Sequence, residues 1–92
     1  MKYSVLIFGR QGCGKCETTQ HKVGHYVKEW GLAHEVDVIC HDLSTVGGLE
    51  AGRPYDILSI PTTIVLRDGE NIARHEGDAP REDWLKKCFG LE

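Results

Sequence analysis

Two cysteines separated by two residues lie where the sequence predicts that a strand turns into a helix. The apolar run from Val5 to Phe8 precedes the segment from Gly9 to Cys16, and a helical pattern of apolar residues follows. Residues i and i+3 of a helix share a face, so the sulfurs of Cys13 and Cys16 can form a disulfide or share a metal ion. The fold must therefore bring a strand and a helix together at these sulfurs.

The spacing of apolar residues predicts the order of the elements. A continuous apolar run indicates a buried strand, spacings of three and four a helix, and alternation a half-buried strand. We expect, in chain order, a strand at 3–8, a helix at 14–30 ended by Gly31, a strand at 34–40, a short helix at 45–51 capped by Ser44, strands at 62–67 and 71–75 around an Asp68-Gly69 turn, and a helix from Pro80 to Gly90. The first strand-helix-strand unit is expected to be parallel and the Asp-Gly hairpin antiparallel. The sequence thus predicts an α/β domain (α+β in some classifications) with a four-stranded mixed sheet and about three helices.

Length and composition limit the classes of protein to consider. Ninety-two residues suffice for one domain, residues 1–92, with one modest core. The net charge is -3 and the basic residues are scattered, so we expect no nucleic-acid or membrane partner. The first apolar run is too short for a signal peptide or a spanning helix, and we therefore expect a cytoplasmic protein. We also expect it to be a monomer.

The first cysteine of the pair meets the needs of a nucleophile. A reactive cysteine must be reachable, and its thiolate must be stabilised. In the first helical turn, Cys13 faces free backbone N–H groups, while Lys15 adds a positive charge. Gly12 and Gly14 leave its sulfur uncovered, and Cys16, one turn inward, is then the resolving thiol. The context favours a redox-active pair.

A second signal, Ser59-Ile60-Pro61-Thr62, comes just before the strand at 62–67. Proline lacks an N–H donor and belongs at the start of a strand, so the tetrapeptide alone indicates only an entry turn. With both signals present, the chain resembles the thioredoxin superfamily over nearly its whole length. The matching residues are Cys13-Gly14-Lys15-Cys16, the stretch from Tyr55 to Thr62, Asp68-Gly69-Glu70, and Gly77.

The resemblance implies a thioredoxin fold in which Pro61 is cis and lies against the disulfide. It implies that the backbone of Ile60 pairs with an extended substrate segment, for which Gly77 leaves room. The implied activity is that of a thiol-disulfide oxidoreductase, which reduces or exchanges protein disulfides through a Cys13–Cys16 cycle and needs no bound cofactor. The implied reductant is a thioredoxin reductase-like enzyme or glutathione.

Polar residues near the exposed sulfur are candidates for selecting the substrate. We expect four of them to surround it, with simple surface placement as the alternative: Arg10, Gln11, Lys15 and Asp78.

Several positions depart from the pattern of thioredoxins proper. Gly12 and Lys15 replace the usual Trp and Pro of the motif. Ile7 replaces a buried Asp that helps to move protons, and His21 replaces a helix proline. The short length is similar to that of glutaredoxins, although Gly77-Asp78 is only half of their double glycine. A glutathione-dependent, glutaredoxin-like reductase is therefore one alternative.

Two alternatives belong to other classes of protein. A metal or iron-sulfur module needs more donors than two thiolates, and the other candidates are His21, His25, Cys40 and His41. Histidines of small acidic proteins are more often solvated, and the sequence predicts no metal ligands. The spacing of Gly9, Gly14 and Lys15 nearly matches a phosphate-binding loop, but Cys16 occupies the position of the Ser or Thr that reaches magnesium.

The remaining cysteines and the tryptophans lie on apolar faces of their elements. We expect Cys40 and Cys88 to be small buried core residues, with a regulatory thiol on the last helix as the alternative. Trp30 and Trp84 should cover the sheet.

Overall fold

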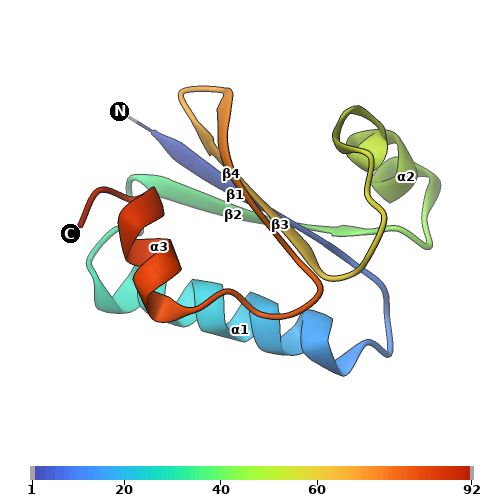
Figure 1. Ribbon diagram of the computed structural model, residues 1–92, viewed down its shortest axis with the longest axis horizontal. Helices are drawn as coiled ribbons and strands as arrows, with labels where there is room; N and C mark the ends of the chain where they lie inside the picture. Colours follow the sequence, from blue (N-terminus) through green and yellow to red (C-terminus); the bar gives the residue numbers. More distant parts are fainter. Residues whose placement is uncertain (1, 92) are drawn as a thin grey trace.

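The computed structural model describes residues 2–91, which form a mixed sheet flanked by helices (Figure 1). The elements in chain order are β1 (Tyr3–Gly9), α1 (Gly14–Glu29), β2 (Val36–Asp42), α2 (Val46–Gly52), a 3-10 turn η1 (Arg53–Tyr55), β3 (Thr62–Arg67), β4 (Glu70–Glu76) and α3 (Glu82–Cys88). The four strands lie in the order β2-β1-β3-β4. The expected fold class and element order are confirmed.

Strand β1 lies at the centre of the sheet, between β2 and β3. It pairs in parallel with β2 and antiparallel with β3, so that Ile7 lies opposite Cys40 on one side and Thr63 on the other. Strand β4 pairs antiparallel with β3 and forms one edge. The C-terminal end of β1 therefore lies beside the N-terminal end of β3, and the loops at this edge of the sheet meet.

Both faces of the sheet are covered, and each face has its own core cluster. Helices α1 and α3 cover one face and α2 lies on the other (Figure 1). Successive residues of β1 alternate between the clusters, since side chains of a strand point to opposite faces. The first cluster consists of Tyr3, Val5, Ile7, Val23, Val27, Val36, Val65, Leu85 and Phe89. The second consists of Leu6, Phe8 and Ile64.

The tryptophans pack against the first cluster, as the sequence predicts. Trp30 and Trp84 are both half-buried there. The ring of Trp30 stacks on that of Tyr26 and meets the ring of Phe89 edge-on, so aromatic contacts join α1 to the end of α3.

The second strand begins two residues later than its alternation predicts. The N–H groups of Glu35 and Val36 both donate to the carbonyl of Leu32, which closes a turn after α1. Residues 34 and 35 therefore belong to this turn, and β2 begins at Val36.

The prediction that Cys40 is a buried core residue is wrong. Cys40 is exposed, whereas Cys88 is half-buried. Strand β2 is the other edge of the sheet, and its first residue, Val36, is buried while the strand becomes exposed toward Cys40. Alternation places Cys40 on the face of α1 but does not reveal how far the helix extends across the edge strand.

Helix α2 forms despite its glycines because two of them allow close packing. Its cap is Thr45 rather than the expected Ser44: the Thr45 hydroxyl accepts a hydrogen bond from the N–H of Gly48 at 2.9 Å. A Cβ at Gly48 would collide with the backbone carbonyl of Asp42, and one at Gly52 would lie 3.2 Å from Ile57. These glycines weaken the isolated helix but allow it to approach the sheet.

We predict opposite effects on stability for alanine at two adjacent glycines. Gly48→Ala should lower the free energy of unfolding by about 1–3 kcal/mol, because the added Cβ forces α2 away from Asp42. Gly47→Ala should raise it by about 0.5–1 kcal/mol, since its Cβ meets no atom within 4 Å and alanine favours a helix. Urea denaturation of the two oxidised variants tests the pair; equal shifts would contradict the close approach at Gly48.

Candidate redox-active site

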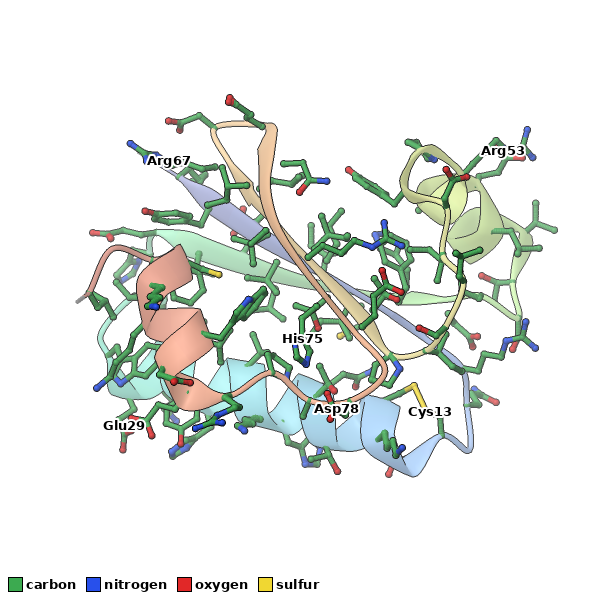
Figure 2. The ribbon with its side chains drawn as sticks, in the orientation of Figure 1. Cys13, Glu29, Arg53, Arg67, His75 and Asp78 are labelled. Atoms are coloured by element: carbon green, nitrogen blue, oxygen red, sulfur yellow. A yellow bond between two sulfur atoms is a disulfide. The ribbon has the colours of Figure 1, made fainter. Side chains whose placement is uncertain are left out.

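Cys13 and Cys16 form a disulfide at the N-terminus of α1, drawn as a yellow bond beside Cys13 in Figure 2. Cys13 is the N-cap, and its sulfur accepts a hydrogen bond from the N–H of Cys16 at 3.1 Å. Free N–H groups and the positive end of the helix dipole face this sulfur. The same features stabilise a thiolate at Cys13 once the disulfide opens.

The two sulfurs differ in their access to solvent. Cys13 is half-buried, whereas Cys16 is only 1% exposed. Cys16 lies directly against Gly9: a Cβ at Gly9 would lie 2.6 Å from the Cys16 sulfur. Because β1 ends in a glycine, the helix can bring Cys16 down onto the sheet. An incoming disulfide can therefore reach Cys13 but not Cys16.

The Ile60–Pro61 peptide bond is cis, as the resemblance implies. Pro61 is buried at the start of β3, and its carbonyl accepts the N–H of Gly77 at 2.9 Å. The hydroxyl of Thr62 donates to the carbonyl of Ser59 at 2.6 Å and closes the turn that contains Ile60. Since Thr62 lies opposite Phe8, Pro61 comes next to Gly9, where Cys16 is seated.

Arg74 of β4 holds the loop that leads to Pro61. Its guanidinium donates to the carbonyl of Tyr55 and, at 2.9 Å, to that of Asp56. It also forms an ion pair with Glu76, whose carboxylate accepts a hydrogen bond from Ser59. The sequence gives no sign of this role, because the contacts depend on which face of β4 meets the loop.

The four residues expected around the exposed sulfur divide between two grooves. One groove, of about 580 Å³, runs from the start of α1 to the loop before α3 and contains Lys15 and Asp78. The other, of about 240 Å³, contains Arg10 and Gln11 together with Cys16. All four residues are exposed. Arg10 and Gln11 thus share a groove with Cys16, whereas Lys15 and Asp78, of opposite charge, line a groove that begins at Gly14.

A histidine that the sequence analysis does not single out contacts Asp78 of the first groove. His75 Nε2 lies 2.7 Å from Asp78 Oδ1, and the ring of His75 contacts that of Trp84. In the view of Figure 2, Asp78 lies between His75 and the disulfide. The Asp78 carboxylate, held by His75, thus lines the same groove as Gly14, the residue after Cys13.

The other candidate metal ligands do not form a metal site with the cysteine pair, although Cys40 and His41 line the groove that also contains Cys16. Within residues 2–91, no three His, Cys, Asp or Glu side chains lie close enough together to hold a metal ion. His21 and His25 are exposed on α1, and His41 stacks on Phe8 on the face opposite α1. Among the same described residues, no helix is long and apolar enough to cross a membrane.

Several solved thioredoxins share this architecture. The thioredoxin of Fasciola hepatica is 24% identical at a TM-score of 0.76, over 99% of this chain and 82% of that one. The germline-specific thioredoxin Deadhead of Drosophila melanogaster is 24% identical at a TM-score of 0.74, over 97% of this chain and 79% of that one. Mitochondrial thioredoxin 3 of Saccharomyces cerevisiae, in its oxidised form, is 18% identical at a TM-score of 0.75, over 98% of this chain and 79% of that one. The chain has the thioredoxin fold, and the fold that the resemblance implies is confirmed.

Sequence comparison alone does not reveal this similarity. No protein-family model matches the chain, and no curated protein matches it. At these identities the similarity concerns the fold, and one fold can carry different chemistries.

The two cysteines outside the disulfide are poorly ionised thiols. Cys40 is exposed, but partial desolvation of its sulfur still raises the pKa of the Cys40 thiol above its ordinary value. Deeper burial raises the pKa of the Cys88 thiol to about 11. The thiolate is the reactive form, so both cysteines are less reactive at neutral pH than a free cysteine.

We predict that alkylation of the oxidised protein depends on pH and distinguishes the two free thiols. At pH 8, about one Cys88 thiol in a thousand is ionised, so iodoacetamide should modify the exposed Cys40 first. Both alkylation rates should rise with pH, because thiols with raised pKa values ionise only at more alkaline pH. Peptide mass spectrometry between pH 7 and 10 measures the rates, and Cys40→Ser should remove the faster one. Equal labelling of both thiols at pH 8 would contradict this ordering.

Proposed function

We propose that the chain is a thiol-disulfide oxidoreductase that reduces or exchanges disulfides of other proteins through Cys13 and Cys16. The observation that carries the proposal is the asymmetry of the disulfide: Cys13 is reachable at the start of α1, whereas Cys16 is buried against Gly9. A reachable nucleophile next to a protected resolving thiol is the arrangement that thiol-disulfide exchange requires. The thioredoxin fold supports the same assignment.

The reaction begins from the reduced pair. The Cys13 thiolate attacks one sulfur of a substrate disulfide, a bond forms between them, and the other substrate sulfur leaves as a thiolate that takes up a proton. Cys16 then loses its proton and attacks the Cys13 sulfur, which releases the second substrate sulfur as a thiolate. The substrate gains two electrons, and the Cys13–Cys16 disulfide forms.

Backbone groups beside the disulfide support a protein substrate. Ile60 lies at the turn before β3, and Gly77, with φ +94, comes directly after β4 without a side chain over the entrance. An extended segment can pair with such backbone groups whatever its sequence. The side chain of Leu58, 86% exposed, adds an apolar contact close by. We therefore infer that unfolded or loop segments of proteins are the substrates.

The reductant that restores the dithiol is inferred from charge. Glutathione carries a net negative charge. The groove at the start of α1 contains Lys15, which would attract glutathione, and the Asp78 carboxylate in place of a second glycine, which offsets that attraction. Like charges facing each other weaken binding. We therefore propose a thioredoxin reductase-like partner over glutathione, in a reducing compartment such as the cytoplasm.

We predict different failures for the two cysteine variants in an insulin-disulfide reduction assay driven by dithiothreitol. Cys13→Ser should reduce insulin no faster than the uncatalysed reaction, because the attacking thiolate is lost. Cys16→Ser should attack once and then remain attached to its substrate, which non-reducing electrophoresis detects. Cys88→Ala, a change far from the disulfide, serves as the control and should keep full activity. Equal activity of the Cys13 and Cys16 variants would contradict the proposal.

We predict that recycling with NADPH separates the two candidate reductants. Thioredoxin reductase should sustain turnover, whereas glutathione with glutathione reductase should sustain little. Asp78→Asn should raise the glutathione-dependent rate, because it removes the opposing charge but keeps the size of the side chain. A high glutathione rate in the unsubstituted protein, unchanged in Asp78→Asn, would overturn the inference about the reductant.

A further inference from the structure

One buried hydroxyl in residues 2–91 has no hydrogen-bond partner, that of Thr63. The residue is completely buried. Neighbouring hydroxyls are satisfied: Thr62 donates to Ser59, and Thr19 donates to the carbonyl of Lys15. A buried polar atom without a partner lowers stability, so an isolated case requires a reason.

Thr63 lies on the face of the sheet where the disulfide is seated. It pairs directly with Ile7 of β1, and both residues face α1. Gly9, the next residue of β1 on that face, is the one against which the Cys16 sulfur packs. The Thr63 hydroxyl and the Cys16 sulfur therefore lie on the same face of the sheet, over neighbouring strands. Of its two cross-strand partners, Ile7 is apolar, and His75 of β4 is paired through Nε2 with Asp78 and makes no hydrogen bond to the hydroxyl.

We propose that the Thr63 hydroxyl donates a hydrogen bond to the Cys16 thiolate after the Cys13–Cys16 disulfide opens. In the disulfide, the Cys16 sulfur carries no charge and is only a weak acceptor, and the Thr63 hydroxyl makes no hydrogen bond to it. A thiolate is a strong acceptor, and a donor in a buried site stabilises it substantially. The inference rests on the proposed Cys13–Cys16 cycle and concerns its second step.

In that step, the hydrogen bond favours the charged form of the attacking sulfur. Cys16 gives its proton to water, its thiolate attacks Cys13, the Cys13–Cys16 bond forms, and the bond from Cys13 to the substrate sulfur breaks. The substrate leaves as a thiolate, so charge is conserved. Thr63 keeps its proton throughout and changes only the fraction of Cys16 that is ionised.

Other groups near Cys16 also affect its ionisation, and they define the background for a test. The charged or titratable residues on the elements around it are Arg10, Lys15, Glu17, Cys40, His41, Asp42, His75 and Asp78. Cys40 is replaced by serine in every protein of the test below, and the other residues remain in place when Thr63 is replaced. A comparison of Thr63→Val with Thr63→Ser therefore isolates the hydroxyl, because valine has the shape of threonine and serine keeps the donor.

The test follows the reduced protein as it reacts with 5,5′-dithiobis(2-nitrobenzoate) in a Cys40→Ser/Cys88→Ala background. Attack by Cys13 releases one nitrothiobenzoate, and attack by Cys16 on the mixed disulfide releases a second. In Thr63→Val, the pH midpoint of the second phase should rise by about one unit, a tenfold change in ionisation. The second phase at pH 7 should slow about threefold, since a more basic thiolate is a better nucleophile and offsets part of the loss. The first phase should not change.

The outcomes separate the inference from its alternatives. Thr63→Ser should behave like the unsubstituted protein, and oxidised Thr63→Val should remain folded because it loses no hydrogen bond. An unchanged second phase in Thr63→Val would overturn the inference, as would equal changes in both phases or in both variants. If the unsubstituted background protein shows no second phase, the Cys13–Cys16 cycle itself fails, and the inference fails with it.

Discussion

The contact between the Cys16 sulfur and the backbone of Gly9 determines how the rest of the structure is arranged. It seats the first turn of α1 directly on the end of β1, where no side chain intervenes. Because β3 runs antiparallel to β1, the same point lies beside the start of β3 and therefore beside Pro61. One close approach thus brings together the disulfide, the cis peptide bond and, through the Pro61 carbonyl, Gly77.

The parts of the site that could be predicted from the sequence are those specified by local chemistry. A Cys-x-x-Cys pair between a strand and a helix needs only its neighbours to be recognised, and Pro61 indicates a strand start by its missing donor. The element order could also be predicted, since the central strand is apolar on both faces and α1 has helical periodicity. Helix α2 is the element that local sequence indicates least clearly, because Gly48 and Gly52 disfavour an isolated helix but allow its close packing in the fold.

The remaining features depend on the register and edges of the sheet, which no local pattern specifies. Cys40 follows the alternation of the core but lies on an edge strand beyond the cover of α1, so it is exposed. Arg74, His75 and Thr63 take their roles from residues on other strands and loops. A shift of one residue in pairing would move each of them to the opposite face. Such roles become visible only when the strands are placed.

Because Ile7 occupies the position of a buried acid, the Cys16 sulfur has no carboxylate at that position to accept its proton. Thioredoxins proper, to which the chain is similar, carry an Asp at this position, and a carboxylate can take up a proton. The Thr63 hydroxyl opposite Ile7 can stabilise a thiolate but is far too weak a base to accept its proton. The proton of Cys16 must then leave through water, and the groove that contains Cys16, Arg10 and Gln11 opens such a route. One carboxylate could accept the proton of Cys16. In this site, the Thr63 hydroxyl stabilises the Cys16 thiolate, and water removes the proton.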